Sequence, residues 1–220
     1  MSGLYFHIMK ELDHFILDVE YSFDKGLLVI EGESGAGKTT LLNCIAGLTS
    51  PDEGSIAYEN SVVYDSARKI NIPARDRRIG YFFQNYALFP HMTVVENICY
   101  GIKNKPEYKE SQKREELVAY TEYVMQMFGI HHLKGKYPNS ISGGEKQRTA
   151  FARAIVTKPK LLLLDEPFSA LDDNTKKAVY REFLQIKEVF RIPTVLITHN
   201  PQESNLFGDH KIVLKHGRIL

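Results

Sequence analysis

Cysteine is scarce in this sequence, with two in 220 residues. Cys44 and Cys99 stand among apolar neighbours and do not have the spacing of metal ligands. The scarcity excludes a disulfide-stapled fold, and the missing spacing excludes a cysteine-based metal centre. We therefore expect both cysteines to be reduced thiols in the core of a cytosolic protein.

Long hydrophobic runs and a charge excess are also missing. The longest purely apolar stretches, such as the four leucines at 161–164, are far too short to cross a bilayer. The first residues, MSGLYFHIMKELDHF, have neither the apolar core nor the cleavage site of a signal peptide. With 28 basic and 27 acidic residues the net charge is +1, so no global field attracts nucleic acid or an anionic membrane. We expect no membrane-spanning segment and no nucleic-acid partner.

The apolar patterns predict strands of two kinds. LYFHIMK and FILDVEYSF alternate apolar and polar residues around ELDH, which predicts an antiparallel hairpin. GLLVIEG, KLLLLDEP and PTVLITH are continuous runs, typical of strands covered on both faces. GSIAYENSVVYDS and RRIGYFFQ predict further strands, and residues 39–46 and 174–190 are predicted helices. The order predicts an α/β fold with a mostly parallel central sheet and an N-terminal antiparallel β portion.

A helical subdomain is predicted between the strands. From about Tyr86 to Ser140 a charged stretch is followed by a helical period. One face of that period is apolar: Leu117, Tyr120, Val124 and Phe128. A chain of this length has room for one large domain with an inserted subdomain. The predicted parts are an N-terminal core portion at 1–85, the helical subdomain at 86–157 and a C-terminal core portion at 158–220.

GESGAGKT, at residues 32–39, follows a predicted strand, begins a predicted helix and matches the phosphate-loop pattern. Its glycines let backbone N–H groups turn around a phosphate, toward which the helix points its positive end. Lys38 would bridge β- and γ-phosphate oxygens, and the Thr39 hydroxyl would ligate Mg²⁺. A purely structural glycine turn is disfavoured, because the four fixed positions coincide by chance in about one such chain in a hundred. The predicted nucleotide-binding residues here are Gly32, Glu33, Ser34, Gly35, Ala36, Gly37, Lys38, Thr39 and Thr40.

Polar side chains end three of the predicted strands. Asp165 and Glu166 follow the leucine run, and in an open α/β sheet this places them at the ligand edge. Asp165 would hold Mg²⁺ through water, and Glu166 would polarise the water that attacks the γ-phosphate. Gln84 would reach Mg²⁺ or the attacking water, and His199 would donate to the γ-phosphate. The alternatives are an acidic pair that only caps a strand and a histidine that is an ordinary satisfied polar residue.

A second glycine loop, Ser142, Gly143 and Gly144, precedes EKQRTAFARAI, whose apolar positions include Ala150, Phe151 and Ala154 at helical spacing. N–H groups at a helix N-terminus again predict an anion site. This loop has no lysine like Lys38 and no acidic strand end of its own. We therefore expect it to close over the γ-phosphate of a nucleotide held by another chain.

These motifs together resemble the nucleotide-binding subunit of an ATP-binding cassette (ABC) transporter. The resemblance covers nearly the whole chain, through residues 32–39, Gln84, ISGGE at 141–145, LLLLDEP, SALD at 169–172 and His199. It implies a P-loop NTPase fold, ATP and Mg²⁺ as cofactors, and ATP hydrolysis. It also implies that two copies pair head to tail, with Ser142, Gly143 and Gly144 on the opposing ATP and Asp172 linking the two sites. Glu166 matches the family's general base and His199 its switch histidine, with Lys38 and Gln84 as further catalytic contacts.

INIP before RDRRIGYFFQ, followed by LFPHMTV, is similar to the ATPase subunits of molybdate and related oxyanion importers, with tungstate or sulfate as alternative cargo. This resemblance implies membrane permease subunits, a substrate-binding protein as an indirect partner, and a peripheral position on the cytoplasmic face of the membrane. The permease would dock near residues 86–94, where apolar side chains follow Gln84: Tyr86, Leu88, Phe89, Met92 and Val94. The alternative is an ordinary hydrophobic cluster within the subdomain.

The sequence departs from the family pattern in its second loop and at the adenine site. Glu145 stands where glutamine is commoner, and Ile141 replaces leucine. Around Leu12, where the family usually stacks adenine on an aromatic ring, there is none. Phe6 and Phe15 are the nearby aromatic candidates, Tyr5 is a less plausible one, and the sequence does not decide among them.

Other functions either leave a motif of the sequence unexplained or need a residue that the sequence lacks. A P-loop GTPase needs Asn-Lys-x-Asp, whereas NKPE at 104–107 ends in the wrong acid. A P-loop kinase gives the second glycine loop no role. Soluble cassette proteins of translation or DNA repair usually have two cassettes or a long coiled coil, and an exporter usually fuses membrane spans. The favoured hypothesis is the ATP-hydrolysing subunit of an importer.

Overall fold

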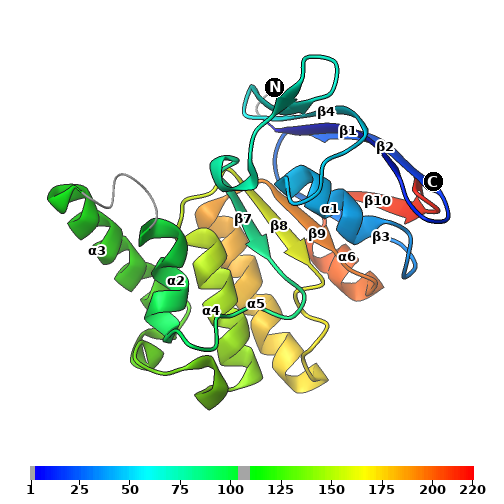
Figure 1. Ribbon diagram of the computed structural model, residues 1–220. Helices are drawn as coiled ribbons and strands as arrows, with labels where there is room; N and C mark the ends of the chain where they lie inside the picture. Colours follow the sequence, from blue (N-terminus) through cyan, green and yellow to red (C-terminus); the bar gives the residue numbers. More distant parts are fainter. Residues whose placement is uncertain (1–2, 104–109) are drawn as a thin grey trace. The chain divides into compact units, whose positions relative to one another are not determined.

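The computed structural model of the chain describes residues 3–103 and 110–220. The NKPE string at 104–107, which ends in the wrong acid for a guanine reader, lies outside these residues. Near the N-terminus, β1 (Leu4–Glu11) and β2 (Ile16–Phe23) form the predicted antiparallel hairpin (Figure 1). β4 (Glu53–Tyr58), β5 (Ser61–Asp65) and β6 (Ile70–Asn71) extend it into a sheet in the order β2-β1-β4-β5-β6. Buried and open side chains alternate along β1, as its sequence pattern predicts.

A second sheet contains the continuous apolar runs. β3 (Leu27–Glu31), β8 (Leu161–Asp165) and β9 (Thr194–Ile197) are buried along nearly their whole length. β9 pairs in parallel with both β3 and β8, so the carboxyl ends of these strands lie at one edge. β10 (His210–Lys215), β7 (Ile79–Phe82) and β11 (Arg218–Ile219) complete the order β11-β10-β3-β9-β8-β7. The predicted α/β fold with a mostly parallel central sheet is confirmed.

Helix α1 (Lys38–Ala46) begins and ends at glycines in the left-handed region, Gly37 with φ 99° and Gly47 with φ 78°. The buried Arg77 guanidinium donates to the carbonyl oxygens of Cys44 and Ile45 at 2.9 and 2.8 Å. A positive group is favourable there, because the helix dipole makes this end negative. A Cβ at position 47 would lie 2.5 Å from Arg77 Nε, so the close approach requires glycine.

Four longer helices lie between residues 94 and 190: α2 (Val94–Lys103), α3 (Ser111–Met127), α4 (Gly143–Ile155) and α5 (Asp173–Phe190). Short 3-10 turns lie at Ala74–Asp76, His131–Leu133 and Pro138–Ser140. Phe151 of α4 stacks near Phe82, Phe128 and Phe183, with ring centroids 4.5, 6.5 and 5.6 Å away. Val124 and Phe128 are buried on the predicted apolar face of α3, and Leu117 and Tyr120 are half-buried.

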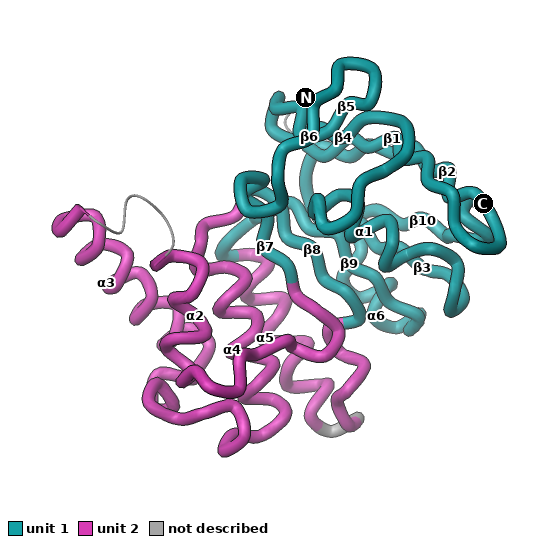
Figure 2. The backbone as a smooth tube through the Cα atoms, viewed as in Figure 1, with its two compact units in different colours: residues 1–81, 160–166, 189–220 teal, residues 82–159, 167–188 magenta. Residues whose placement is uncertain are grey.

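The contacts divide the chain into two compact units (Figure 2). The first contains residues 1–81, 160–166 and 189–220, and the second contains residues 82–159 and 167–188. The second unit includes the stretch 86–157 predicted as a helical subdomain. It also includes residues 167–188, which the sequence predicts to belong to the C-terminal core portion.

Both cysteines lie in the core, as the sequence predicts. Cys44 and Cys99 are buried free thiols, and burial raises the pKa of the Cys44 thiol to about 11. In the part of the chain that the structure describes, no helix combines the length and apolar character that a bilayer crossing needs.

Candidate functional site

The phosphate loop, residues 32–39, joins the end of β3 to the start of α1. Gly32 has φ 150°, and a Cβ there would lie 2.2 Å from the carbonyl oxygen of Leu214. Lys38 is buried, and its Nζ donates to the carbonyl oxygens of Gly32 and Glu33, both at 2.8 Å. The loop therefore surrounds the Lys38 ammonium group. Phosphate oxygens of a bound nucleotide would replace the two carbonyl oxygens as its acceptors.

Burial lowers the pKa of the Lys38 ammonium, and the charges of Glu166 and Asp165 oppose that shift. Asp165 ends β8 and is 6% exposed. The Thr39 hydroxyl donates to its Oδ1 at 3.4 Å. Burial is also the main reason why the pKa of Asp165 is raised, and the charge of Glu166 adds to it. A buried carboxylate beside a hydroxyl is a hard oxygen donor set that favours a cation such as Mg²⁺.

Glu166 and His199 meet at the carboxyl ends of neighbouring strands. His199 Nδ1 lies 3.3 Å from Glu166 Oε1. Glu166 has φ 44°, a conformation unfavourable for a residue other than glycine, and its N–H donates to the carbonyl oxygen of Ile197 at 3.1 Å. The structure thus brings together, in the first unit, the predicted site residues Lys38, Thr39, Asp165, Glu166 and His199.

The signature loop, Ser142, Gly143 and Gly144, begins α4 in the second unit. Glu145 N–H donates to Ser142 Oγ at 3.4 Å, while Ser142 N–H and hydroxyl donate to Glu145 Oε2 at 2.7 and 2.8 Å. These bonds form a capping box and lower the pKa of Glu145, the backbone bond most of all. Ser142 and Gly143 are exposed, and a Cβ at Gly143 would meet nothing within 4 Å. The loop is open to a ligand, but a carboxylate engages its serine.

Two further predicted site residues also belong to the second unit. Gln84 is exposed two positions after β7. Asp172 accepts from Thr175 N–H at 3.1 Å and from Thr175 Oγ1 at 2.6 Å, next to the start of α5. Gly144 lies beside the same threonine, since a Cβ there would be 3.7 Å from Thr175 Cγ2. Roles for Gln84 and Asp172 at the nucleotide stay predictions.

The predicted docking segment, residues 86–94, is held by two side chains that the sequence reasoning missed. The Asn97 amide is buried and donates to the carbonyl oxygens of Phe89 and Met92 at 3.1 and 3.0 Å. Arg153 donates to the carbonyl oxygen of Tyr86 at 2.6 Å. One expectation was wrong: Val94 is fully buried at the start of α2, because its side chain packs inward there, and it cannot contribute to an exposed surface.

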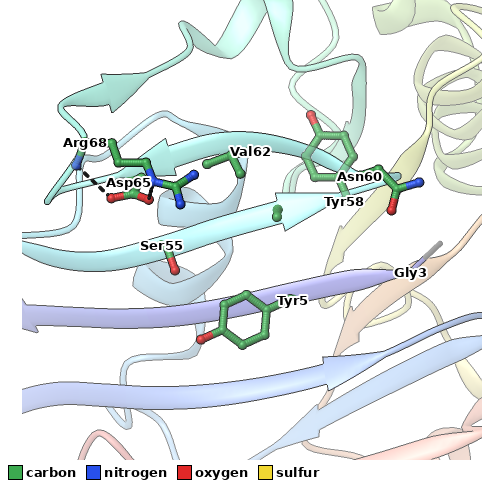
Figure 3. Close-up of a pocket in the computed structure, with 9 residues that line it drawn as sticks. Gly3, Tyr5, Ser55, Tyr58, Asn60, Val62, Asp65 and Arg68 are labelled. Carbon is green, nitrogen blue, oxygen red and sulfur yellow. Dashed lines mark hydrogen bonds and ion pairs between the residues drawn. The ribbon is translucent and has the colours of Figure 1, made fainter. Parts of the chain in front are cut away.

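The three aromatic candidates for the adenine lie in different places. Phe6 is fully buried in the core. Tyr5 lines a hollow of about 300 Å³ against β4 and β5, with Tyr58 and Val62 (Figure 3). Phe15 adjoins the phosphate loop, since a Cβ at Gly37 would lie 3.5 Å from Phe15 Cε2.

The β10–β11 turn packs on Phe15. The ring of His216 meets it edge-on at 6.5 Å, and a Cβ at Gly217 would lie 2.7 Å from Phe15 Cδ2. No local signal in the sequence pairs this turn with a residue two hundred positions earlier. Phe15 is therefore the candidate ring beside the phosphate loop.

Comparison with known proteins gives relatives over the whole chain. The Molybdenum import ATP-binding protein ModC of Vibrio vulnificus is 41% identical over 221 residues, covering 100% of this chain and 57% of the relative. The Sulfate/thiosulfate import ATP-binding protein CysA 1 of Shewanella oneidensis is 40% identical, covering 92% of this chain and 51% of the relative. The chain thus spans little more than half the length of these relatives.

Solved structures share the fold. A nucleotide-free ATP-binding cassette from an ABC transporter superposes with a TM-score of 0.83 at 26% identity, covering 100% of this chain and 90% of the other. The dimeric structure of a bacterial ABC transporter cassette gives 0.76 at 27% identity, covering 98% and 96%. Residues 17–169 match the family described as ABC transporter. The chain accordingly belongs to the ABC transporter family, in the part that forms its ATP-binding cassette.

Proposed function

We propose that this chain is the ATP-hydrolysing subunit of an ABC importer. The observation that carries the proposal is the 3.3 Å contact between Glu166 and His199, at the strand ends that also carry Asp165. Thr39, which donates to Asp165, ties the phosphate loop to the same edge. A phosphate loop, a hard cation site and a carboxylate that can accept a proton from water together suit in-line attack of water on a γ-phosphate.

Each side chain has one task in this mechanism. Backbone N–H groups of residues 32–40 and the Lys38 ammonium bind the phosphates. Thr39, Asp165 through a water, and Gln84 would hold Mg²⁺, which neutralises charge on the phosphate oxygens when bound. Glu166 accepts the proton of the attacking water, and His199 donates a hydrogen bond to the γ-phosphate.

The other half of the site comes from a second copy. Ser142, Gly143 and Gly144 of one copy would bind the γ-phosphate held by its partner, and Asp172 would link the two sites. The exposure of Ser142 and Gly143 at the N-terminus of α4 supports this arrangement. The dimeric form of a related cassette supports it as well.

Motion between the paired copies would reach membrane permease subunits through residues 86–93, at the cytoplasmic face of the membrane, with a substrate-binding protein delivering the cargo. Molybdate is the proposed cargo, since a relative named for molybdenum import reaches 41% identity. Tungstate is proposed beside it as a similar oxyanion. Sulfate is the second candidate, because a CysA relative reaches 40%. All of these are tetrahedral oxyanions.

Phosphate release from Mg-ATP by the complete transporter, reconstituted with its permease and binding protein, tests the proposed function. We expect hydrolysis that saturates with ATP and rises on addition of molybdate or tungstate. The same measurement with sulfate tests the second candidate cargo. Stimulation by sulfate alone would move the cargo to the second candidate. Absence of ATP hydrolysis in every arm would refute the proposed function.

Glu145→Gln is expected to strengthen ATP-dependent pairing. The Glu145 carboxylate holds the Ser142 N–H and hydroxyl, so it places a negative charge beside the predicted γ-phosphate position. Glutamine can keep the cap without that charge. The ATP concentration for half-maximal dimer formation should fall by about three- to tenfold, and less at high salt. Glu116→Gln, which removes an exposed charge from α3, is the control, and an equal shift in both variants would contradict the local effect.

Phe15→Ala is expected to weaken ATP binding by about tenfold or more, the loss of one base stacked on an aromatic ring. Phe15→Tyr keeps the ring and should bind ATP as the unaltered chain does. Calorimetric titration with ATP measures both variants. Tyr5→Ala is the matched control, since Tyr5 lies in the separate hollow on β1, β4 and β5 (Figure 3). Unchanged ATP affinity in Phe15→Ala would remove Phe15 as the base platform.

A further inference from the structure

The residues on both sides of His199 are tied to one buried carboxylate. The Thr198 hydroxyl donates to Glu203 Oε2 at 2.5 Å. The same hydroxyl oxygen accepts the Asn200 N–H at 3.0 Å, and the Asn200 amide lies 3.5 Å from Glu203 Oε1. Thr198 and Glu203 are only 2% and 4% exposed. His199 is therefore exposed, while the residues before and after it are both held by the buried Glu203 carboxylate.

This network is more than a helix cap. Helix α6 (Pro201–Phe207) begins after Asn200, whose Oδ1 already accepts the Gln202 N–H at 2.9 Å. A glutamate three residues after the cap commonly accepts the N–H of the capping residue. Here Asn200 N–H goes to the Thr198 hydroxyl, and Glu203 accepts that hydroxyl. The Asn200 N–H is thus linked to Glu203 through the Thr198 hydroxyl, on the other side of His199.

The same segment is fixed to the strands that hold the rest of the site. Thr198 N–H donates to the carbonyl oxygen of Ile30, just before the phosphate loop, at 3.3 Å. Glu166 N–H donates to the carbonyl oxygen of Ile197 at 3.1 Å. Because backbone bonds fix residues 197 and 198 and the Thr198 hydroxyl fixes residue 200, the direction of His199 is set at both ends.

Burying a carboxylate destabilises the folded state unless hydrogen-bond donors accompany it. We propose that Thr198 and Glu203 are positioning residues that aim His199 at Glu166 and the γ-phosphate, an inference that rests on the proposed function. Neither side chain touches the reacting atoms. Loss of the Thr198 hydroxyl leaves Lys38 and Thr39 unchanged, so ATP affinity should hold while turnover falls.

Thr198→Val tests the proposal, because it keeps the shape of the side chain and removes the hydroxyl. We expect kcat for ATP hydrolysis to fall by about 10- to 100-fold, the effect of a small misplacement of a catalytic group, with KM within about twofold. Thr198→Ser restores the hydroxyl and should restore the rate. Glu203→Gln keeps an acceptor and should give a smaller loss of kcat, which provides a second readout if Thr198→Val does not fold.

A double-mutant cycle separates positioning from general damage. If Thr198 acts through His199, Thr198→Val should lower kcat no further in a His199→Ala background. Losses that multiply, or wild-type kcat in a folded Thr198→Val variant, would overturn the inference while leaving the proposed function intact. An unaltered chain that hydrolyses no ATP in its transporter would instead overturn the proposed function.

Discussion

Glu166→Gln should leave ATP binding intact and lower turnover by about 10²–10⁴-fold, the range for loss of a general base. Glutamine has the shape of glutamate, so the phosphate loop, Lys38 and Thr39 should still bind the nucleotide. It cannot accept the proton of the attacking water. Single-turnover phosphate release, with a separate ATP titration, measures the two effects independently.

The matched control for Glu166 is Glu20→Gln, which neutralises an exposed carboxylate of β2 in the same unit. Its turnover should equal that of the unaltered chain. Wild-type turnover in Glu166→Gln would assign the base to another group. Loss of ATP binding in that variant would show instead that Glu166 contributes to binding ATP rather than to the chemical step.

Ser142→Arg has the second large expected effect: no ATP-dependent pairing, with ATP still bound by single copies. Ser142 is exposed in the signature loop, where a long cationic side chain would fill the space needed by the partner's γ-phosphate. Light scattering with and without ATP measures the pairing, and calorimetry measures binding.

Two controls separate a blocked interface from a damaged helix. Ser142→Ala removes the hydroxyl that caps α4, worth about 1 kcal/mol, but adds no bulk. It should weaken pairing far less than arginine does. Ser111→Arg adds the same charge at the start of α3 and should pair normally. Normal ATP-dependent dimers in Ser142→Arg would contradict the two-copy site.

Local sequence patterns predicted several strands and several of the candidate site residues. Continuous apolar runs predicted β3, β8 and β9, because strands buried on both faces have no polar alternation. The phosphate loop and the acidic end of β8 followed from motif chemistry and from the rule that parallel strands end at one edge. The contact between Glu166 and His199 is the outcome of that rule.

Contacts between segments distant in the sequence could not be predicted from it. Arg77 capping α1 and Asn97 holding residues 89–93 are single polar residues whose partners are backbone carbonyls, which no residue pattern reveals. The capping box at Ser142 and Glu145 was different. Its S-x-x-E spacing was readable, yet Glu145 was interpreted only as a departure from a family pattern.

Mixing the two disabled variants tests the central claim most directly. Each copy of Ser142→Arg keeps its own Glu166, and each copy of Glu166→Gln keeps its own signature loop. A mixed pair therefore has one site with both parts intact. When equal amounts of the two nearly inactive proteins are mixed, we expect hydrolysis to rise toward about a quarter of the wild-type rate, the share of intact sites for random pairing. The rise should stay below that share, because the arginine also weakens the mixed pair. No gain on mixing, or full activity of Ser142→Arg alone, would mean that one copy completes its own site.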